Sequence, residues 1–278
     1  MSIRQIDPSL PKGFQYAGIR AGLKQEDRKD LGLITTDTDA VVGAVYTSNR
    51  FPSAHVQYCR QLTPNDQFRA LIINSGNANA ATGEKGIQAN LDLVRGVAKR
   101  MNLNEQQVLS SSTGIIGRPF PIDTIESSLD TLIQALGNSP QDTAEAIMTT
   151  DTLAKLASKE FMIDGVSYAV MGFAKGSGMI HPNMGTMLAY IMTDAPISLS
   201  NIQDLTQEVA NKSFNCVSID GDTSTNDSFY LVSSQPAPED SLLPDELRHA
   251  ITRVAMSLAR QIAADGEGAE HLLEVTVK

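Results

Sequence analysis

Residues 175–195 read KGSGMIHPNMGTMLAYIMTDA, and within this stretch a loop rich in glycine becomes an apolar strand. Gly185 and Thr186 lie where the change occurs. Glycine tolerates backbone angles that other residues avoid, and threonine carries a hydroxyl that becomes a nucleophile once a base activates it. This pair raises the hypothesis that the chain is cut between the two residues.

A cut after Gly185 would make Thr186 an N-terminal residue. Its α-amine, with an ordinary pKa of about 7.7–8.0, can then act as general base for its own hydroxyl. A strained peptide at a glycine exposes its carbonyl to attack by the next hydroxyl, which gives self-cleavage a chemical route. The alternative is structural: the glycine lets the chain enter a strand whose first residue is β-branched. The two residues alone leave both interpretations open.

Other catalytic and metal-binding patterns give no competing signal. Residues 220–225, DGDTST, begin like a calcium loop, but Thr225 stands where the loop needs glycine and Leu231 where it needs glutamate. No GxxxxGK or GxGxxG sequence supports a nucleotide-phosphate site. The histidines have no metal-ligand spacing, although a Ser-His-Asp triad assembled through space stays open; they are His55, His181, His249 and His271.

Composition narrows the class of protein. The 278 residues are 41% hydrophobic, which is enough for a substantial core. The net charge of −10, from 22 basic and 32 acidic residues, argues against a nucleic-acid or anionic-membrane surface, because both need a positive field. The sequence has only two cysteines, with no signal-peptide pattern and no apolar stretch approaching the roughly 20 residues of a membrane span. We therefore expect a cytoplasmic protein that acts on small polar molecules.

Hydrophobic periodicity predicts a mixed α/β fold. Two helices are expected from apolar residues at helical spacing over residues 87–101 and 247–262, and Asp164-Gly165 predicts a hairpin turn. Because these elements mix without strict βαβ alternation, a layered α/β arrangement is favoured over a doubly wound sheet. The predicted strands include residues 70–73, 108–109, 166–173, 186–192, 229–232 and 272–277.

Five stretches, in order, resemble segments of the ornithine acetyltransferase family, also called bifunctional glutamate N-acetyltransferase, of arginine biosynthesis. The stretch KGSGMIHPNMGTMLAYIMTDA at 175–195, the fourth of them along the chain, is similar to the self-cleaving segment of that family. The others are NSGNANAATG at 74–83, SSSTGIIGRPFP at 110–121, IMTTDT at 147–152 and DGEGAEHLLEVTV at 265–277. The resemblance runs from near Gly18 to the last residue. It implies a helix-sheet-sheet-helix architecture of the N-terminal-nucleophile type.

The resemblance also implies roles for individual residues. Autoproteolysis between Gly185 and Thr186 would give an α chain, residues 1–185, and a β chain, residues 186–278, with Thr186 as catalytic nucleophile. In the family alanine is common before the threonine, and glycine should still permit cleavage. Thr113 and Gly114 match the oxyanion-hole pair. The matching substrate-binding positions are Thr152, Lys175, Thr186 and Glu267.

The implied reaction is ping-pong acetyl transfer. Thr186 would take the acetyl group of N2-acetyl-L-ornithine as an ester, and the amine of L-glutamate would then accept it. No metal or organic cofactor is implied, and acetyl-CoA is a second acetyl donor for some family members. The expected partners are these small molecules and the paired α and β chains, assembled as a heterotetramer of two of each.

One departure from the family concerns length. Family members continue well beyond the EVTV segment, and their additional tail carries two further substrate-binding positions, so we expect a partial sequence. Two alternatives to the transferase stay open: an N-terminal-nucleophile amidase or aminopeptidase that uses water as acceptor, and a truncated homologue without catalysis.

Overall fold

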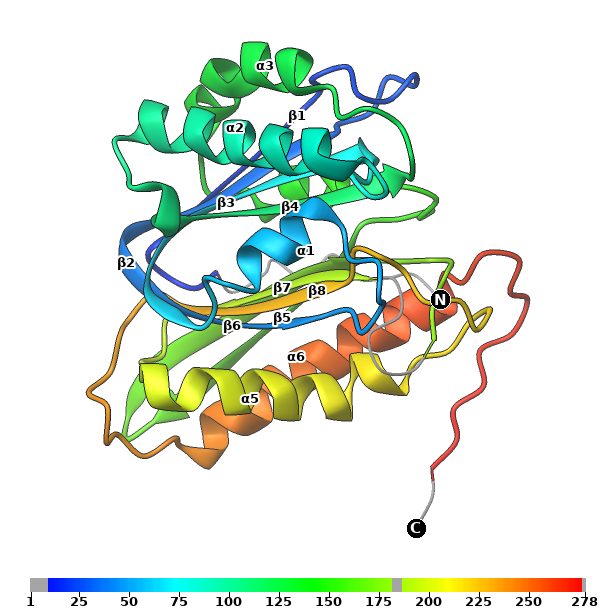
Figure 1. The fold of residues 1–278 in the computed structure, drawn as a ribbon. Coiled ribbons are helices and arrows are strands. Elements are labelled where there is room, and N and C mark those ends of the chain that lie inside the picture. The colour runs from blue at the N-terminus through cyan, green and yellow to red at the C-terminus, as the bar shows by residue number, and fades with distance from the viewer. Residues whose placement is uncertain (1–9, 182–186, 277–278) are drawn as a thin grey trace.

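The computed structural model describes residues 10–181 and 187–276, and over these residues the strands form one hydrogen-bonded path (Figure 1). The strand order is β4-β3-β2-β8-β7-β6-β5, with β1 paired to β2 beside this path. Neighbours are antiparallel except for two parallel pairs, β3 with β4 and β7 with β8. In chain order the strands are β1 (Phe14–Ile19), β2 (Leu31–Tyr46), β3 (Asn65–Asn77), β4 (Val108–Ile115), β5 (Lys155–Ile163), β6 (Val166–Lys175), β7 (Leu188–Thr193) and β8 (Ser228–Ser233).

All the described helices but the last lie in connections between these strands, and the last follows β8. Among the described residues, none of the helices is both long enough and apolar enough to cross a membrane. The α-helices are α1 (Ala54–Cys59), α2 (Gly83–Met101), α3 (Ile122–Gln134), α4 (Pro140–Ala146), α5 (Leu199–Lys212) and α6 (Asp245–Ala264), and two short 3-10 helices are η1 (Glu105–Gln107) and η2 (Phe214–Cys216).

The long strand β2 joins two halves of the sheet. Its first part, Leu31 to Thr35, pairs with both β1 and β3, whereas its second part, Val41 to Tyr46, pairs with β8. The pairing of β2 with β3 is irregular between Thr35 and Ala40. Irregular pairing bends a strand and increases its twist. The sheet can therefore fold over so that β1–β4 face β5–β8, as Figure 1 shows.

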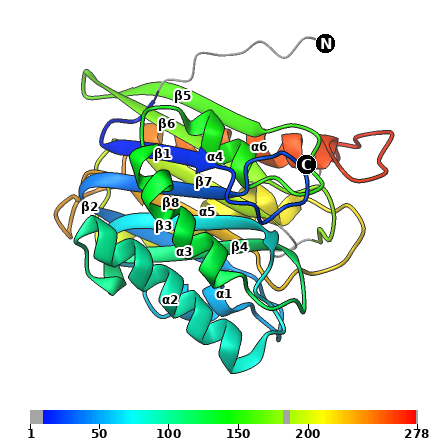
Figure 2. The same ribbon diagram turned by 90° about the horizontal axis from the view of Figure 1, so that it is seen from above.

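Three apolar cores separate four layers. Figure 1 shows the layers from α2 and α3 to α5 and α6 one above another, and Figure 2 looks down on them from above. One core lies between α2, α3 and the outer face of β1–β4, and another lies between α5, α6 and the outer face of β6–β8. The third lies between the two halves of the sheet and contains contacting rings of Tyr16, Phe173, Tyr190 and Tyr230. Strand β7 is buried along its whole length, because its alternate side chains enter two different cores. The expected helix-sheet-sheet-helix architecture is confirmed.

The local predictions hold for most elements. Helices α2 and α6 cover the two periodic segments, and five of the six predicted strands coincide with β3, β4, β6, β7 and β8. The hairpin between β5 and β6 turns at Asp164 and Gly165, which have φ values of +48° and +82°. Asp-Gly is common in such turns because both central residues need positive φ. Strand β7 begins at Leu188; Thr186 lies outside the described residues.

The predicted strand at 272–277 is wrong over its described part. Residues 271–276 form no strand, and the side chains of Leu273 and Val275 are 86% and 83% exposed. The side chain of Glu274 pairs with that of Arg260 in α6. A strand needs a neighbour with free backbone groups, and none of the described strands pairs with these residues.

Helix α5 approaches β2 closely at Gly43. A Cβ atom at Gly43 would lie 2.5 Å from Thr206 Oγ1 and 2.8 Å from the Ile202 carbonyl oxygen. Both atoms belong to α5, and the carbonyl is backbone that cannot rotate away. Glycine is therefore required here by the distance between the helix and the sheet.

Gly43→Ala should lower the free energy of unfolding by about 1–3 kcal/mol, the usual cost of overpacking a core. Gly137→Ala is the matched control, because a Cβ there would meet nothing within 4 Å. Urea unfolding of both variants, followed by circular dichroism, measures the difference. Equal stability of the two variants would contradict the close approach of α5 to β2.

Candidate active site

Several of the predicted site residues that the structure describes lie at the end of the sheet where β6 ends and β7 begins. Lys175 is the last residue of β6, and its Cα pairs with that of Leu188 in β7. Gly185 and Thr186 lie outside the described residues, so the cleavage site and the nucleophile stay predictions. Met187 is described and buried. The chain therefore re-enters the described structure beside Lys175.

Lys175 contacts the predicted oxyanion-hole threonine. Its ammonium donates to Thr113 Oγ1 over 3.3 Å, and the two residues are only 4% and 6% exposed. An ammonium can only donate, so the hydroxyl of Thr113 must accept, and its own proton is left for another acceptor. The contact joins the end of β6 in one half of the sheet to β4 in the other. Two residues predicted separately from the sequence are thus neighbours.

Gly114 follows Thr113 at a close approach of two backbones. Its φ is +128°, and a Cβ there would lie 2.4 Å from the carbonyl carbon of Gly76, which has a φ of +100°. The two glycines are paired in the parallel ladder of β3 and β4. Only glycine accommodates both this angle and this distance. The NSGNAN and SSSTGI segments therefore meet through their glycines.

The buried ammonium of Lys175 lies among charged groups of several elements. The pKa of Lys175 is lowered on balance: burial, the largest cause, and the nearby ammonium of Lys155 lower it, and the carboxylates of Asp151 and Asp227 raise it. Burial alone would raise the pKa of Asp151, but Lys175 and Lys155 bring it down to about 2. Asp151 is therefore a carboxylate at neutral pH, and its charge favours the protonated form of Lys175.

Residues 226 and 227 tie the site together, and the sequence reasoning missed both. Asp227 Oδ1 accepts the N–H of Met187 over 2.9 Å, so it holds the start of the strand that follows the predicted cleavage site. The Asn226 amide donates to the carbonyls of Ser112 and Ala78 over 2.8 and 2.6 Å. The signal in the sequence is the acidic stretch that starts at Asp220 and runs directly into these two residues.

Thr152 and Glu267 reach the site from two other segments, and both are exposed. The hydroxyl of Thr152 donates to Asp265, and its N–H donates to the same carboxylate over 3.0 Å. The backbone N–H of Glu267 donates to the Ser177 carbonyl over 2.6 Å. Glu267 Oε2 lies 3.0 Å from the place a Cβ of Gly178 would take. Glu267 therefore lies beside the loop that follows Lys175, and Thr152 is bound to the segment that carries Glu267.

The one histidine that is fully buried among the described residues is structural. His55 lies between hydroxyls, with Nδ1 2.9 Å from Ser53 Oγ and Nε2 3.1 Å from Ser228 Oγ. Burial lowers its pKa to about 3, so the ring stays neutral and connects α1 to the start of β8. No carboxylate is among its hydrogen-bond partners, and a Ser-His-Asp triad is therefore not formed at His55.

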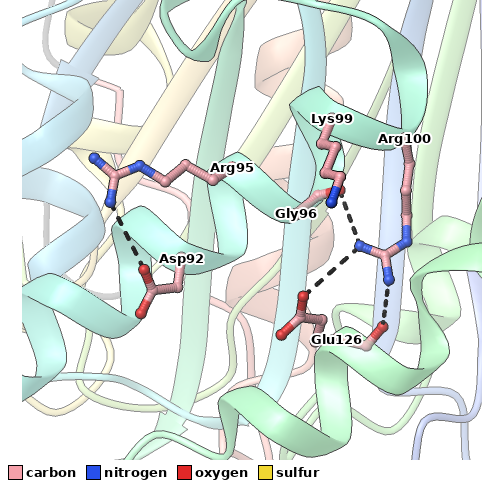
Figure 3. Close-up of a pocket in the computed structure, with 6 residues that line it drawn as sticks. All are labelled: Asp92, Arg95, Gly96, Lys99, Arg100 and Glu126. Carbon is pink, nitrogen blue, oxygen red and sulfur yellow. Dashed lines mark hydrogen bonds and ion pairs between the residues drawn. The ribbon is translucent and has the colours of Figure 1, made fainter.

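Metal chemistry and surface hollows give no second site. Within residues 10–181 and 187–276, no group of three or more His, Cys, Asp or Glu side chains could hold a metal ion. A hollow of about 500 Å³ between α2 and α3 is lined by charged side chains (Figure 3). Its guanidinium groups already pair with carboxylates: Arg95 with Glu105 at 3.1 Å and Arg100 with Asp130 at 3.0 Å. We interpret it as a solvated helix surface.

Comparison with known proteins places the chain in a family. The model of the ArgJ family matches residues 15–278. The arginine biosynthesis bifunctional protein ArgJ of Geobacter sulfurreducens is 40% identical over 273 residues, which cover 96% of this chain and 70% of that protein.

Solved structures agree with this match. The crystal structure of arginine biosynthesis bifunctional protein ArgJ from Bacillus halodurans aligns with a TM-score of 0.59 and 35% identity, over 64% of this chain and 92% of that one. Ornithine acetyltransferase from Mycobacterium tuberculosis, crystallised with ornithine, aligns with a TM-score of 0.56 and 28% identity, over 66% of this chain and 97% of that one. By the match of its sequence over almost its whole length, the chain belongs to the ArgJ family.

Proposed function

We propose that the protein is an acetyltransferase of arginine biosynthesis, which moves an acetyl group from N2-acetyl-L-ornithine to L-glutamate. The observation that carries the proposal is the buried contact between Lys175 and Thr113, beside the buried Met187 that precedes strand β7 and follows the predicted cleavage site. The names of the relatives support arginine biosynthesis, and the ornithine in the Mycobacterium tuberculosis structure supports the substrate class.

The proposed nucleophile is Thr186, freed by self-cleavage after Gly185. Its α-amine takes the proton of its own hydroxyl, which attacks the acetyl carbonyl, and then gives this proton to the amine of ornithine, which leaves as an acetyl-threonine ester forms. The amine of glutamate then attacks the ester, and the proton it loses passes through the α-amine to restore the Thr186 hydroxyl. The negative oxygen formed in each step needs hydrogen-bond donors already directed at it. The hydroxyl of Thr113 suits this role, because its proton is not used in the bond with Lys175.

Substrate recognition is assigned to three further residues. Lys175, a compact cation, pairs with a substrate carboxylate, whereas the exposed carboxylate of Glu267 pairs with an amino group. Thr152 completes the set. No metal or organic cofactor takes part, and acetyl-CoA is a possible second donor. Strand β6 lies before the cut and β7 after it. The two chains stay associated because these strands pair along their length and share two cores. The proposed assembly is a cytoplasmic heterotetramer of two α and two β chains.

Self-cleavage predicts two polypeptides. Denaturing mass spectrometry of the purified protein should give fragments that correspond to residues 1–185 and 186–278. Thr186→Ala should give one uncut chain, because the attacking hydroxyl is gone. Efficient cleavage in Thr186→Ala would show that another residue attacks, and an uncut wild-type chain would leave Thr186 without its amine and remove the proposed mechanism.

Acetyl transfer predicts dependence on glutamate. Incubation with N2-acetyl-L-ornithine should release ornithine steadily and form N-acetylglutamate only when glutamate is present, as chromatography with mass detection would measure. An amidase would instead produce acetate at the same rate with and without glutamate. No turnover under either condition, from a protein that has been cut, would favour the homologue without catalysis.

Thr113→Val should lower kcat about 100- to 1,000-fold, the usual effect of losing one oxyanion donor, while it keeps the shape of the side chain. Thr206→Val is the matched control, because it removes another buried threonine hydroxyl, which bonds the Ile202 carbonyl within α5. Steady-state kinetics of both variants in their cleaved forms provides the comparison. A similar kcat in the two variants would exclude Thr113 from the oxyanion site.

A further inference from the structure

Lys155 is a fully buried cation held by two carboxylates. Its ammonium lies 2.7 Å from Asp151 Oδ1 and 2.5 Å from Asp265 Oδ2, and the three side chains are 0%, 0% and 6% exposed. Buried ion pairs add little to stability compared with apolar residues of the same volume, because desolvation offsets the attraction. Stability alone therefore does not explain why three charged groups are buried here.

Asp151 connects its own loop to the backbone that follows Lys175. Its Oδ1 accepts the N–H of Gly176 over 2.7 Å, immediately after Lys175. Its Oδ2 accepts the N–H of Thr149 over 2.9 Å. The position of the Lys175 backbone is thereby linked to the loop between α4 and β5, which carries Thr152.

Asp265 makes the corresponding link at the end of α6. Both of its oxygens bind Thr152, one through the N–H at 3.0 Å and the other through the hydroxyl. It lies two residues before Glu267, whose N–H is bound to the Ser177 carbonyl. Lys155 pairs with both carboxylates. One ammonium therefore connects the loop that carries Thr152, the segment that carries Lys175 and the segment that carries Glu267. Strand β4 and the start of β7 are not part of this connection.

We propose that Asp151, Lys155 and Asp265, the charged cluster, are positioning residues of the active site. The cluster fixes Lys175, Thr152 and Glu267 relative to one another, and Asp151 supplies negative charge that faces the Lys175 ammonium. The identity of the substrate used to test this rests on the proposed function. None of the three carries out a chemical step.

Asp151→Asn keeps the shape of the side chain and removes its charge. The charged groups that face Lys175 are Asp151, Asp227 and Lys155, so loss of Asp151 removes one of two charges that favour the ammonium. The titration midpoint of Lys175 should therefore move to lower pH. NMR of protein with 13C at the lysine ε carbon measures it, with the Lys175 signal assigned by its loss in Lys175→Arg. A midpoint that is unchanged or higher would overturn the electrostatic part of the proposal.

Asp265→Asn tests the geometric part of the proposal, that the charged cluster fixes the substrate contacts. This variant also keeps the proposal testable if Asp151→Asn does not fold. Loss of the charged acceptor for Thr152 and Lys155 should weaken ornithine binding about tenfold in calorimetry, a typical effect of losing a hydrogen bond to a charged group. KM for N2-acetyl-L-ornithine should rise by a similar factor, with kcat changed less. Unaltered affinity for ornithine, or a fall in kcat at constant KM, would contradict the positioning role.

Asp130→Asn is the matched control, because it removes a carboxylate that pairs with Arg100 on the surface and is 69% exposed. It should change neither the Lys175 midpoint nor the affinity for ornithine. Failure of the proposed function is a separate result: wild-type protein that forms no N-acetylglutamate refutes the acetyl transfer, whereas the Lys175 titration in Asp151→Asn still decides the electrostatic role of the cluster.

Discussion

Two buried ammonium groups, those of Lys155 and Lys175, constrain the arrangement of the whole site. Lys155 begins β5 and pairs with Ala174 of β6, the residue before Lys175, so the two cations lie on neighbouring strands at one end of the sheet. A buried cation is tolerated only when hydrogen-bond acceptors and negative charges surround it. The acceptors come from the loop before β5, the end of α6 and the end of β4. Segments far apart in the sequence are thus drawn to one place.

The folded-over sheet makes this meeting possible. Thr113 lies near the end of β4 at one end of the strand order, whereas Lys175 lies in β6 near the other end. In a flat sheet the two would be separated by four intervening strands. Because β2 pairs with one half through its first part and with the other through its second, the two halves face each other and the contact forms. The bend in β2 is therefore as necessary to the site as the residues that line it.

The sequence predicted the elements with strong periodicity and the residues that carry family motifs. Helices α2 and α6 and the hairpin at Asp164 depend on local spacing, which sequence records directly. The strand predicted at 272–277 failed, because apolar alternation cannot reveal whether a pairing partner exists. The charged cluster was beyond reach for another reason: Asp151 and Asp265 lie in motifs that were recognised, but their shared partner Lys155 is identified only by three-dimensional contact.

The site residues comprise a buried pair and an exposed pair, and burial and exposure suit different roles. Thr113 and Lys175 are buried and bonded to each other, so their positions are set before any substrate arrives. Such fixed donors suit the stabilisation of developing charge, which loses its benefit if the donors must reorganise. Thr152 and Glu267 are exposed and are held by bonds to their backbones, which leaves the Glu267 carboxylate able to turn toward a ligand. The buried Thr113 is therefore suited to the chemical step, Lys175 to a fixed contact with a substrate carboxylate, and the exposed Glu267 to a contact that adjusts to the ligand, with the charged cluster connecting these segments.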